Sequence, residues 1–275
     1  GNKITIEVQN EKKTGSYELE IIKTDESWNK ITEGTAKFSV KVNSNAETEV
    51  TSNQGTANFG TIAITDISTN DTIKITESVA PSGYNKLIEE IQLSVEKEDT
   101  GTGYGAKEVT LTGSTKARAT LSGNKITVEV QNEKKTGSYD LEIIKTDESW
   151  NKIESGTAKF NVKVNSEDVN EVTTTAGVGN YGTINILDIS SQDTITIEES
   201  EEPEGYNKLI GNVSVKVNKV EKESALGVGT VEVSNENVNA EYDSTNNKVV
   251  IKVQNQKKKG SYELEIVTTD ESWNK

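Results

Sequence analysis

The amino-acid sequence predicts an all-β protein made of two complete β-sandwich domains in tandem. Apolar and polar residues alternate with a period of two through segments rich in Val, Ile and Thr, which is typical of half-buried strands. Turn-forming residues separate these segments, at Asn70-Asp71, Pro81-Ser82-Gly83 and Gly123-Asn124. A long internal repeat sets the size of each domain.

The repeat has a period of one small domain. Residues 1–30 return as residues 123–152 at an offset of 122, with only Ile6 replaced by Val128 and Glu18 replaced by Asp140. A third copy of this motif occupies residues 253–275. A period of this length corresponds to an independent sandwich and not to one turn of a solenoid.

Seven strands are expected in the first repeat. They lie near residues 16–24, 36–43, 59–65, 71–77, 90–96, 107–111 and 125–132. About seven short strands in about 120 residues fit a two-sheet sandwich. No helix is expected beyond a turn or two, because the alternation leaves no helical period.

The repeat also predicts the domain boundaries. We expect 1–10 as the last strand of a preceding repeat, 11–15 as a linker, 16–132 as a repeat, 133–137 as a linker, 138–255 as a repeat, 256–260 as a linker and 261–275 as the first strand of a following repeat. The chain therefore reads as an excerpt of a longer array. Such short linkers favour a semi-rigid rod of beads.

Composition excludes several function classes. The 275 residues include no Cys, His or Met, so disulfides are excluded and the commonest general base and metal ligand are missing. The net charge of −15 disfavours binding to nucleic acid. No apolar run is long enough to span a membrane. We expect a protein that is not a turnover enzyme and that needs no cofactor.

Three strands each end an apolar face with one polar side chain. Residues two apart on a strand face the same side. Lys23 follows the inward set Leu19 and Ile21, Glu77 follows Ile73 and Ile75, and Asn132 follows Ile126, Val128 and Val130. The second repeat keeps the same phase at Lys145, Glu199 and Asn255, whereas the neighbouring Glu198 is expected to point outward.

Two interpretations of these side chains compete. In the first they are strand-end residues, with the Lys ammonium in water beside the Glu. In the second they meet in the core, where burial lowers the pKa of an amine and raises that of a carboxylic acid. A neutral amine could then attack a carboxamide that the acid polarises. Fixed juxtaposition can match effective molarities of roughly 10⁵–10⁸ M.

The order of the motifs resembles a known family. GSYELEIIKTDES, GTAKF (34–38), TIKITESVAPSGYNK and ITVEVQNEKK together resemble the collagen-adhesin B-type (CnaB, or SpaA-like pilin) domain of Gram-positive surface proteins. The resemblance implies immunoglobulin-like sandwiches that each form an autocatalytic isopeptide bond. It also implies a structural stalk of an adhesin or fibre, extracellular on a bacterial surface, either anchored to the cell wall or part of a fibre.

The resemblance assigns a role to each residue of the pattern. Lys23 would bond to Asn132 with Glu77 as catalyst, and Lys145 would bond to Asn255 with Glu199 as catalyst. Asn10 would by the same logic crosslink to a preceding repeat. Ser78 and Ser200 stand where the family often has Thr, and Thr268 replaces the reactive Lys in the third copy.

Other functions stay open at this point. Trp28 and Trp150 lie in a loop motif, so each repeat could be a glycan-binding or protein-binding adhesin module. A calcium-stiffened repeat is suggested by Asp66 with Asp71 and by Asp188 with Asp193, but the spacing matches no calcium loop. A polymerising pilus shaft subunit would need an external Lys motif and a sorting signal. The expected partners are neighbouring repeats or head-to-tail copies of the chain, with a tip ligand that the sequence does not name.

Overall fold

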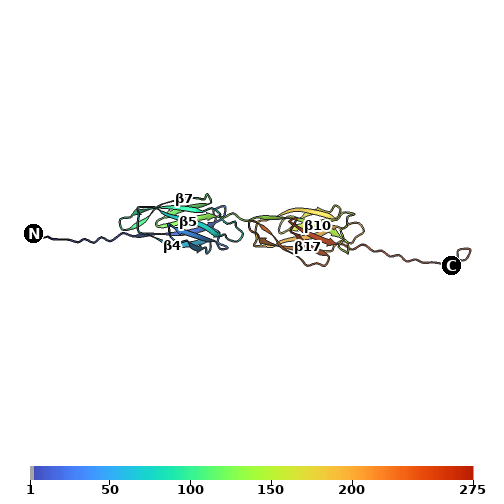
Figure 1. The fold of residues 1–275 in the computed structure, drawn as a ribbon. Helices are drawn as coiled ribbons and strands as arrows, with labels where there is room; N and C mark the ends of the chain where they lie inside the picture. The colour runs from blue at the N-terminus through green and yellow to red at the C-terminus, as the bar shows by residue number, and fades with distance from the viewer. Residues whose placement is uncertain (1–2, 275) are drawn as a thin grey trace. The chain divides into compact units, whose positions relative to one another are not determined.

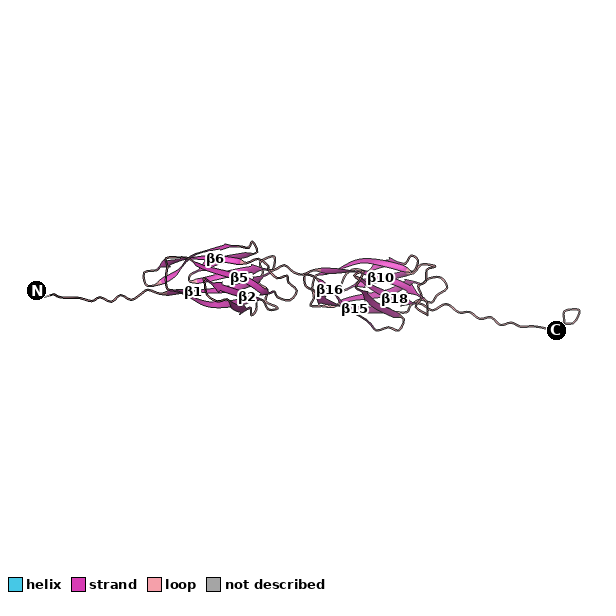
Figure 2. Ribbon diagram, viewed as in Figure 1, coloured by secondary structure: helices cyan, strands magenta, loops and turns pink. Residues whose placement is uncertain are grey.

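The computed structural model describes residues 3–274 and divides them into two compact units. The first unit ends at Lys135 and the second begins at Thr136. Every regular element in the described residues is a β-strand, which confirms the all-β fold (Figures 1 and 2). Within this part of the chain no helix exists that could cross a membrane.

Each unit contains nine strands. In the first they are β1 (Gly15–Thr24), β2 (Lys37–Val42), β3 (Thr48–Thr51), β4 (Thr56–Ile64), β5 (Asp71–Val79), β6 (Ile91–Asp99), β7 (Tyr104–Thr112), β8 (Ala117–Ser122) and β9 (Lys125–Gln131). In the second they are β10 (Gly137–Thr146), β11 (Lys159–Val164), β12 (Asn170–Thr173), β13 (Val178–Ile186), β14 (Asp193–Glu201), β15 (Asn212–Glu221), β16 (Leu226–Val233), β17 (Val238–Asp243) and β18 (Lys248–Gln254).

The sequence pattern missed β3 and β8. Val50 is the only buried residue of β3, and Ala117 is the only buried residue of β8. Both strands lie at the edge of a sheet, and β3 buries one side chain, whereas β8 contributes the small Ala117 and Ala119 and the partly buried Leu121, so the apolar signal is weak. The seven strands that were expected are all present, although β4 begins at Thr56 and β7 begins at Tyr104, earlier than predicted.

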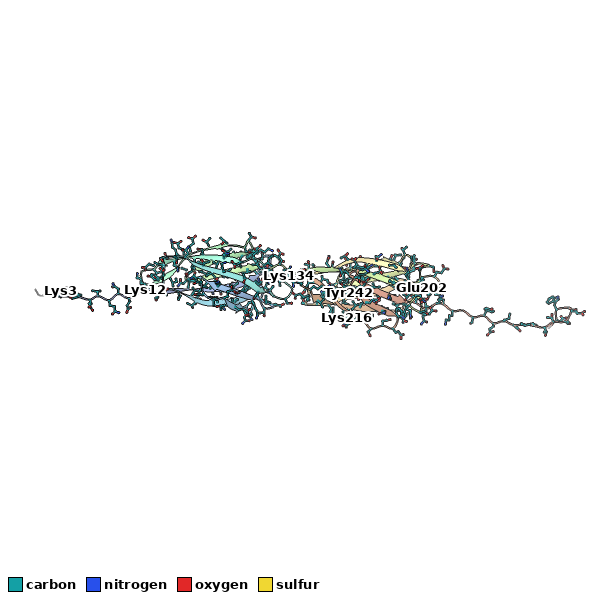
Figure 3. All side chains as sticks on the ribbon, viewed as in Figure 1. Lys3, Lys12, Lys134, Glu202, Lys216 and Tyr242 are labelled. Atoms are coloured by element: carbon teal, nitrogen blue, oxygen red, sulfur yellow. The ribbon has the colours of Figure 1, made fainter. Side chains whose placement is uncertain are left out.

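Two sheets pack face to face in each unit. In the second unit their orders are β13-β10-β18-β17 and β12-β11-β14-β15-β16. The corresponding strands of the first unit have the same order, and one β-pairing between Gly15 and Tyr104 joins its two sheets. Buried Leu, Ile, Val and Phe side chains fill the space between the sheets. Charged residues such as Lys3, Lys12 and Lys216 are exposed, as Figure 3 shows.

The first and last strands of each unit are neighbours and run parallel. β1 pairs with β9 from Glu18↔Lys125 to Thr24↔Gln131, and β10 pairs with β18 from Asp140↔Lys248 to Thr146↔Gln254. Because the two strands are parallel, the chain enters this pair at one end of the sandwich and leaves it at the other.

The segments expected as linkers make backbone hydrogen bonds to the preceding domain. Asn85 N donates to Glu133 O at 2.8 Å, and Lys135 N donates to Gly83 O at 2.8 Å. The second unit repeats this arrangement, with Lys258 N donating to Gly205 O at 2.8 Å. Alternation could not reveal this pairing, because the partner loop lies about 50 residues away in sequence.

The outer segments carry no strand in the described residues. Residues 3–14 and 258–270 are exposed throughout. A local turn follows the second of these segments, where Asp270 Oδ1 accepts hydrogen bonds from Ser272 N at 2.8 Å and Asn274 N at 3.0 Å. Asp25 and Asp147 form the same turn inside the two domains. This turn is therefore encoded locally.

The glycine that begins each repeat gives a test of the fold. A Cβ at Gly15 would lie 1.8 Å from Tyr104 O, and one at Gly137 would lie 2.0 Å from Leu226 O, whereas nothing lies within 4 Å at Gly260. Gly15→Ala should destabilise its domain by about 1–3 kcal/mol, because backbone must move where the two sheets meet. Gly260→Ala is the matched control at the same repeat position and should have no effect. Equal denaturant midpoints for both variants would contradict this packing.

Candidate functional site: two buried Lys-Glu-Asn triads

Because alternate residues of a strand face the same side, Lys23, Glu77 and Asn132 lie in the core. Lys23 is 0% exposed at the end of β1, Glu77 is 5% exposed on β5, and Asn132 is 1% exposed directly after β9. Lys145, Glu199 and Asn255 are buried equally in the second unit, and Glu198 is exposed as predicted. We call each set a buried triad. Both sheets of the sandwich contribute to it, because β1 and β9 belong to one sheet and β5 belongs to the other.

The glutamate of each triad bridges the amine and the carboxamide. Lys23 Nζ lies 2.9 Å from Glu77 Oε1, and Asn132 Nδ2 donates to Glu77 Oε2 at 2.8 Å. Lys145, Glu199 and Asn255 show the same two distances, 2.9 Å and 2.8 Å. One carboxyl group therefore contacts the two groups that could react and can carry a proton between them.

Backbone groups hold the triad from one side. Asn132 Nδ2 also donates to Asn85 O at 2.7 Å, and Leu87 N donates to Glu77 Oε2 at 2.7 Å. Asn207 O and Leu209 N make the equivalent contacts in the second unit. Sequence reasoning missed these residues because they act through their main chains, which any residue type can supply. The signal that could have found them is the GYNKL segment, which both repeats contain.

Burial changes the electrostatics of the lysines. Desolvation lowers the pKa of Lys23 and of Lys145, and the charge of the adjacent glutamate opposes this shift only in part. Phe38 contributes an aromatic ring whose centre lies 5.5 Å from Lys23 Nζ, and Phe160 does the same for Lys145. Burial therefore moves each lysine toward the neutral, nucleophilic amine, whereas the glutamate charge and the ring face favour the ammonium.

The triads contain nearly all of the unsatisfied buried polar atoms. Among the described residues, buried side-chain atoms without a hydrogen-bond partner are Lys23 Nζ, Glu77 Oε1, Asn132 Oδ1, their three equivalents in the second unit, and Ser200 Oγ. The Lys and Glu atoms are at ion-pair distance but lack hydrogen-bond geometry. Unsatisfied buried groups are costly and rare in native proteins, so two identical clusters call for a chemical explanation.

An open crevice adjoins each triad. In the first unit it has a volume of about 240 Å³, and Asn132 and Asn85 line it together with the chain around Ile88. In the second unit a crevice of about 270 Å³ lies beside Asn255 and Asn207. The asparagine of each triad therefore borders a crevice that is open to solvent.

The remaining candidate residues lie outside these clusters. Asn10 and Thr268 are exposed in the outer segments and contact neither triad. Asp71 and Asp193 are buried, whereas Asp66 and Asp188 accept hydrogen bonds from Ser68 and Ser190 in exposed turns. No group of acidic residues that could hold a metal ion occurs in the described residues.

Trp28 and Trp150, the two tryptophans of the loop motif, differ in which side chains contact their rings. The Arg118 guanidinium lies 4.4 Å from the centre of the Trp28 ring and also pairs with Glu129. Asn239 takes the place of Arg118 in the second repeat, and Trp150 is 39% exposed. Trp28 thus packs at the edge of its sandwich beneath a cation.

This contact predicts a spectroscopic change. In a chain with Trp150→Phe and Trp273→Phe, Arg118→Asn should shift the emission of Trp28 to longer wavelength, because water replaces the guanidinium. The domain should lose about 0.5–1 kcal/mol of stability. Lys116→Asn is the control, since Lys116 directly precedes β8 and pairs with Glu133 instead of lying over Trp28. An unshifted spectrum, or an equal shift in both variants, would show that Arg118 does not cover the ring.

Part of the chain matches a known protein family. Residues 17–110 match the family model described as the SpaA prealbumin-like fold domain. No curated protein matches the chain.

Several solved structures are similar to the chain at low sequence identity. One is the C-terminal fragment of the pilus adhesin SpaC from Lactobacillus rhamnosus GG, with 14% identity, a TM-score of 0.44, and coverage of 93% of this chain and 100% of that fragment. A second is the Bacillus anthracis TIE protein, with 20% identity, a TM-score of 0.39, and coverage of 89% of this chain and 34% of that one. A third is the major pilin from Streptococcus pyogenes, with 11% identity, a TM-score of 0.30, and coverage of 90% and 99%.

The family match covers the strands that contribute Lys23 and Glu77, and the second unit repeats the sequence, the strand order and the triad of the first. Residues 17–110 of the first unit are therefore similar to a SpaA prealbumin-like fold domain, and the second unit shares the repeat sequence and strand order of that domain.

Proposed function

We propose that the chain consists of stalk repeats of a Gram-positive surface adhesin or fibre, located outside the cell. Each complete repeat closes itself with one isopeptide bond, Lys23 to Asn132 and Lys145 to Asn255. The duplicated buried triad, with its unsatisfied amine and carboxamide atoms, is the observation that carries this proposal. The reaction occurs once in each domain, so the protein crosslinks itself and is not a turnover enzyme.

The reaction balances without a co-reactant. A proton moves from Lys23 Nζ to Glu77 Oε1 over 2.9 Å and leaves a neutral amine. Nζ attacks Asn132 Cγ, and Glu77 returns a proton through Oε2 to Nδ2, from which it lies 2.8 Å. Glu77 then takes a second proton from Nζ and passes it on to the same nitrogen, the Cγ–Nδ2 bond breaks, the nitrogen leaves as ammonium, and a secondary amide joins Nζ to Cγ. Glu77 is unchanged at the end, as a general acid and base must be.

The surroundings support each step. Both hydrogens of Asn132 Nδ2 are directed, one to Glu77 and one to Asn85 O, so the leaving group is fixed in place. The crevice beside Asn85 and Asn132 gives ammonia a path to solvent. The product also removes the buried ammonium and makes its nitrogen part of a neutral amide, which relieves the cost of an incompletely paired charge.

Strand topology gives the bond a mechanical role. Tension enters β1 at Gly15 and leaves after β9, and these strands lie side by side and parallel. Force along them shears their ladder, and the bond from Lys23 to Asn132 carries that force directly from one strand to the other. The intervening chain, about 360 Å when extended at about 3.3 Å per residue, then bears no load. A stalk built in this way resists stretching.

The outer segments suggest the partners. Ile4, Ile6 and Val8 are 87%, 80% and 77% exposed, although their equivalents in β9 are buried. Leu264 and Ile266 are 77% and 82% exposed, although their equivalents in β1 are buried. Exposed apolar strand faces favour pairing with other chains. We therefore assign residues 1–10 and 261–275 to sandwiches of neighbouring repeats, in a longer chain or between head-to-tail copies.

In such a neighbour Asn10 would supply the carboxamide of the preceding repeat. Thr268 would leave the following repeat without this amine, and a hydroxyl without a base is the weaker nucleophile.

Intact mass tests the proposed bonds. The purified chain should weigh less than its sequence mass by two ammonia molecules. Glu199→Ala should lose only one, because the second domain then lacks its catalyst, whereas the control Glu198→Ala should lose two, since that neighbour is exposed. A wild-type chain at its full sequence mass would refute the bonds, and two ammonia losses in Glu199→Ala would refute the role of Glu199.

Single-molecule pulling tests the mechanical role. The wild-type chain should show no unfolding step of about 360 Å, the extended length between Lys23 and Asn132 at about 3.3 Å per residue. Glu77→Ala should release one such step, because its first domain is unlinked. Unfolding of wild-type domains with full release of length would contradict a force-bearing crosslink.

A further inference from the structure

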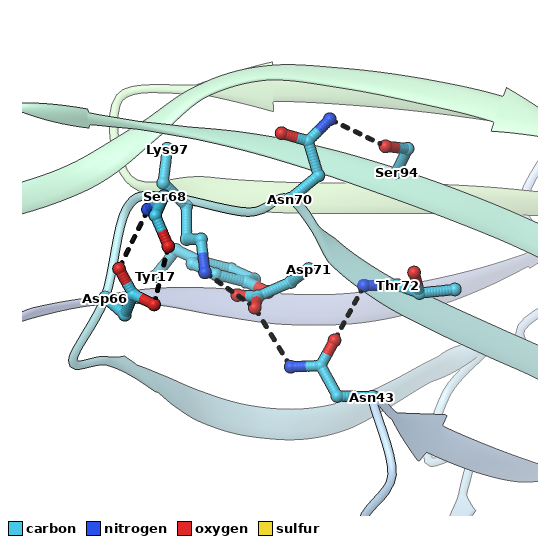
Figure 4. A network of polar contacts seen from close by, with 9 residues as sticks. All are labelled: Tyr17, Asn43, Asp66, Ser68, Asn70, Asp71, Thr72, Ser94 and Lys97. Carbon is cyan, nitrogen blue, oxygen red and sulfur yellow. Dashed lines mark hydrogen bonds and ion pairs between the residues drawn. The ribbon is translucent and has the colours of Figure 1, made fainter.

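A second buried polar cluster lies at the other end of β1 and β5. Tyr17 OH donates to Asp71 Oδ2 at 3.0 Å, Lys97 Nζ lies 2.8 Å from Asp71 Oδ1, and Asn43 Nδ2 donates to the same oxygen at 2.9 Å. Asn43 Oδ1 in turn accepts from Thr72 N at 2.8 Å. We call Tyr17, Asn43, Asp71 and Lys97 the aspartate cluster (Figure 4).

The second domain contains the same cluster. Tyr139 OH donates to Asp193 at 3.3 Å, Asn165 Nδ2 donates at 2.9 Å, and Lys219 Nζ lies 3.2 Å from the same carboxylate. Asn43 and Asn165 also share an unusual backbone, with φ of 54° and 52°. The arrangement is therefore a property of the repeat.

The aspartate cluster contains an amine, a carboxylate and a carboxamide, yet its chemistry differs from that of the triad. Three donors saturate Asp71, and none of the cluster's side-chain polar atoms is among the buried unsatisfied atoms of the described residues. Burial, the Asp71 charge and its hydrogen bond raise the pKa of Tyr17, so its hydroxyl stays a donor. Asn43 is exposed to water on one side. The aspartate cluster is therefore a stable ionic contact whose groups are not arranged to react with one another.

The aspartate cluster and the triad lie on the same two strands. Tyr17 precedes Lys23 by six residues on β1, and Asp71 precedes Glu77 by six on β5, so both pairs join the same two strands across the two sheets. Between them these strands present only apolar inward side chains, Leu19 and Ile21 from β1 and Ile73 and Ile75 from β5.

Apolar packing between sheets does not by itself fix how far one strand slides along the other, because the hydrophobic effect is non-directional. Ladder hydrogen bonds fix the register within each sheet, and the Gly15–Tyr104 backbone pairing between the sheets joins β1 to β7 and not to β5. A slip of two residues keeps every apolar side chain inward and moves Lys23 by about 6.6 Å relative to Glu77. A directional contact at the far end of the same strands prevents that slip.

We propose that the aspartate cluster positions the crosslink: the Tyr17–Asp71 contact, held by Lys97 and Asn43, fixes β1 across β5 so that Lys23 meets Glu77 and Asn132. This inference rests on the proposed isopeptide function. Its residues are positioning residues, since none of them contacts the atoms that react.

The test replaces the cluster by apolar groups of similar size, Tyr17→Phe with Asp71→Leu and Lys97→Met. Such a replacement of a buried ion pair is often neutral or stabilising, so a purely stabilising cluster predicts unchanged crosslinking. A positioning cluster predicts that the first domain still melts cooperatively but closes at least about tenfold more slowly, since a misplacement of about 1 Å can cost about 100-fold in rate. The full chain is made by cell-free synthesis, and crosslinked peptides are counted by mass at intervals.

Two controls make the outcome decisive. The unaltered second domain of the same molecule should close at the wild-type rate, and Ile126→Val, which loosens the core on β9 without contacting the cluster, should leave the first domain's rate within about twofold. Tyr17→Phe alone should show a smaller slowing in the same direction.

Equal rates for both domains of the triple variant, or equal slowing in Ile126→Val, would overturn the positioning role. Absence of ammonia loss from the second domain as well would overturn the proposed crosslink itself, so the two failures are distinguishable.

Discussion

The burial of a lysine beside a glutamate in an apolar core is the constraint on which the rest of this structure depends. Lys23 and Lys145 are fully enclosed, and each amine has one carboxyl group beside it. Charged residues are almost never fully buried unless they are paired, because desolvation costs more than a single contact returns. The fold tolerates this arrangement twice, at the same position of each repeat. A covalent amide between the lysine and the nearby asparagine is the chemical state in which the cost disappears.

The sandwich places the triad between the first and the last strand of each domain. Lys23 ends the first strand and Asn132 follows the last one, and those strands are neighbours in one sheet while Glu77 faces them from the other. The proposed bond would therefore connect the strand at which the chain enters the domain to the strand at which it leaves. The segment after β9 is bound to the loop that holds Asn132 and Glu77, so the exit of the chain is coupled to the site.

Each sandwich has two polar ends and an apolar middle. The triad and the aspartate cluster use the same pair of strands, and both connect one sheet to the other. They differ in saturation: the aspartate has all the donors it needs, whereas the triad leaves an amine and a carboxamide oxygen without hydrogen-bond partners. In the proposed function only the triad, whose polar atoms are unsatisfied, forms a covalent bond.

Local periodicity is what the sequence by itself determined. The period of two placed Lys23, Glu77 and Asn132 on inward faces, and the repeat showed that the same phase recurs in Lys145, Glu199 and Asn255. The same rule also puts Tyr17 and Asp71 inward, six residues before Lys23 and Glu77. It could not detect β3 and β8, where few side chains contact the core, nor Asn85 and Leu87, which act through the main chain.

Tertiary structure alone decided which inward groups meet. Lys97 and Asn43 reach Asp71 from a third strand and a turn, and the segment expected as a linker pairs with a loop about 50 residues away. The parallel pairing of β1 with β9 is equally invisible to alternation. The physical reason is that strand periodicity depends on neighbouring residues, whereas contacts between sheets depend on how the whole chain packs.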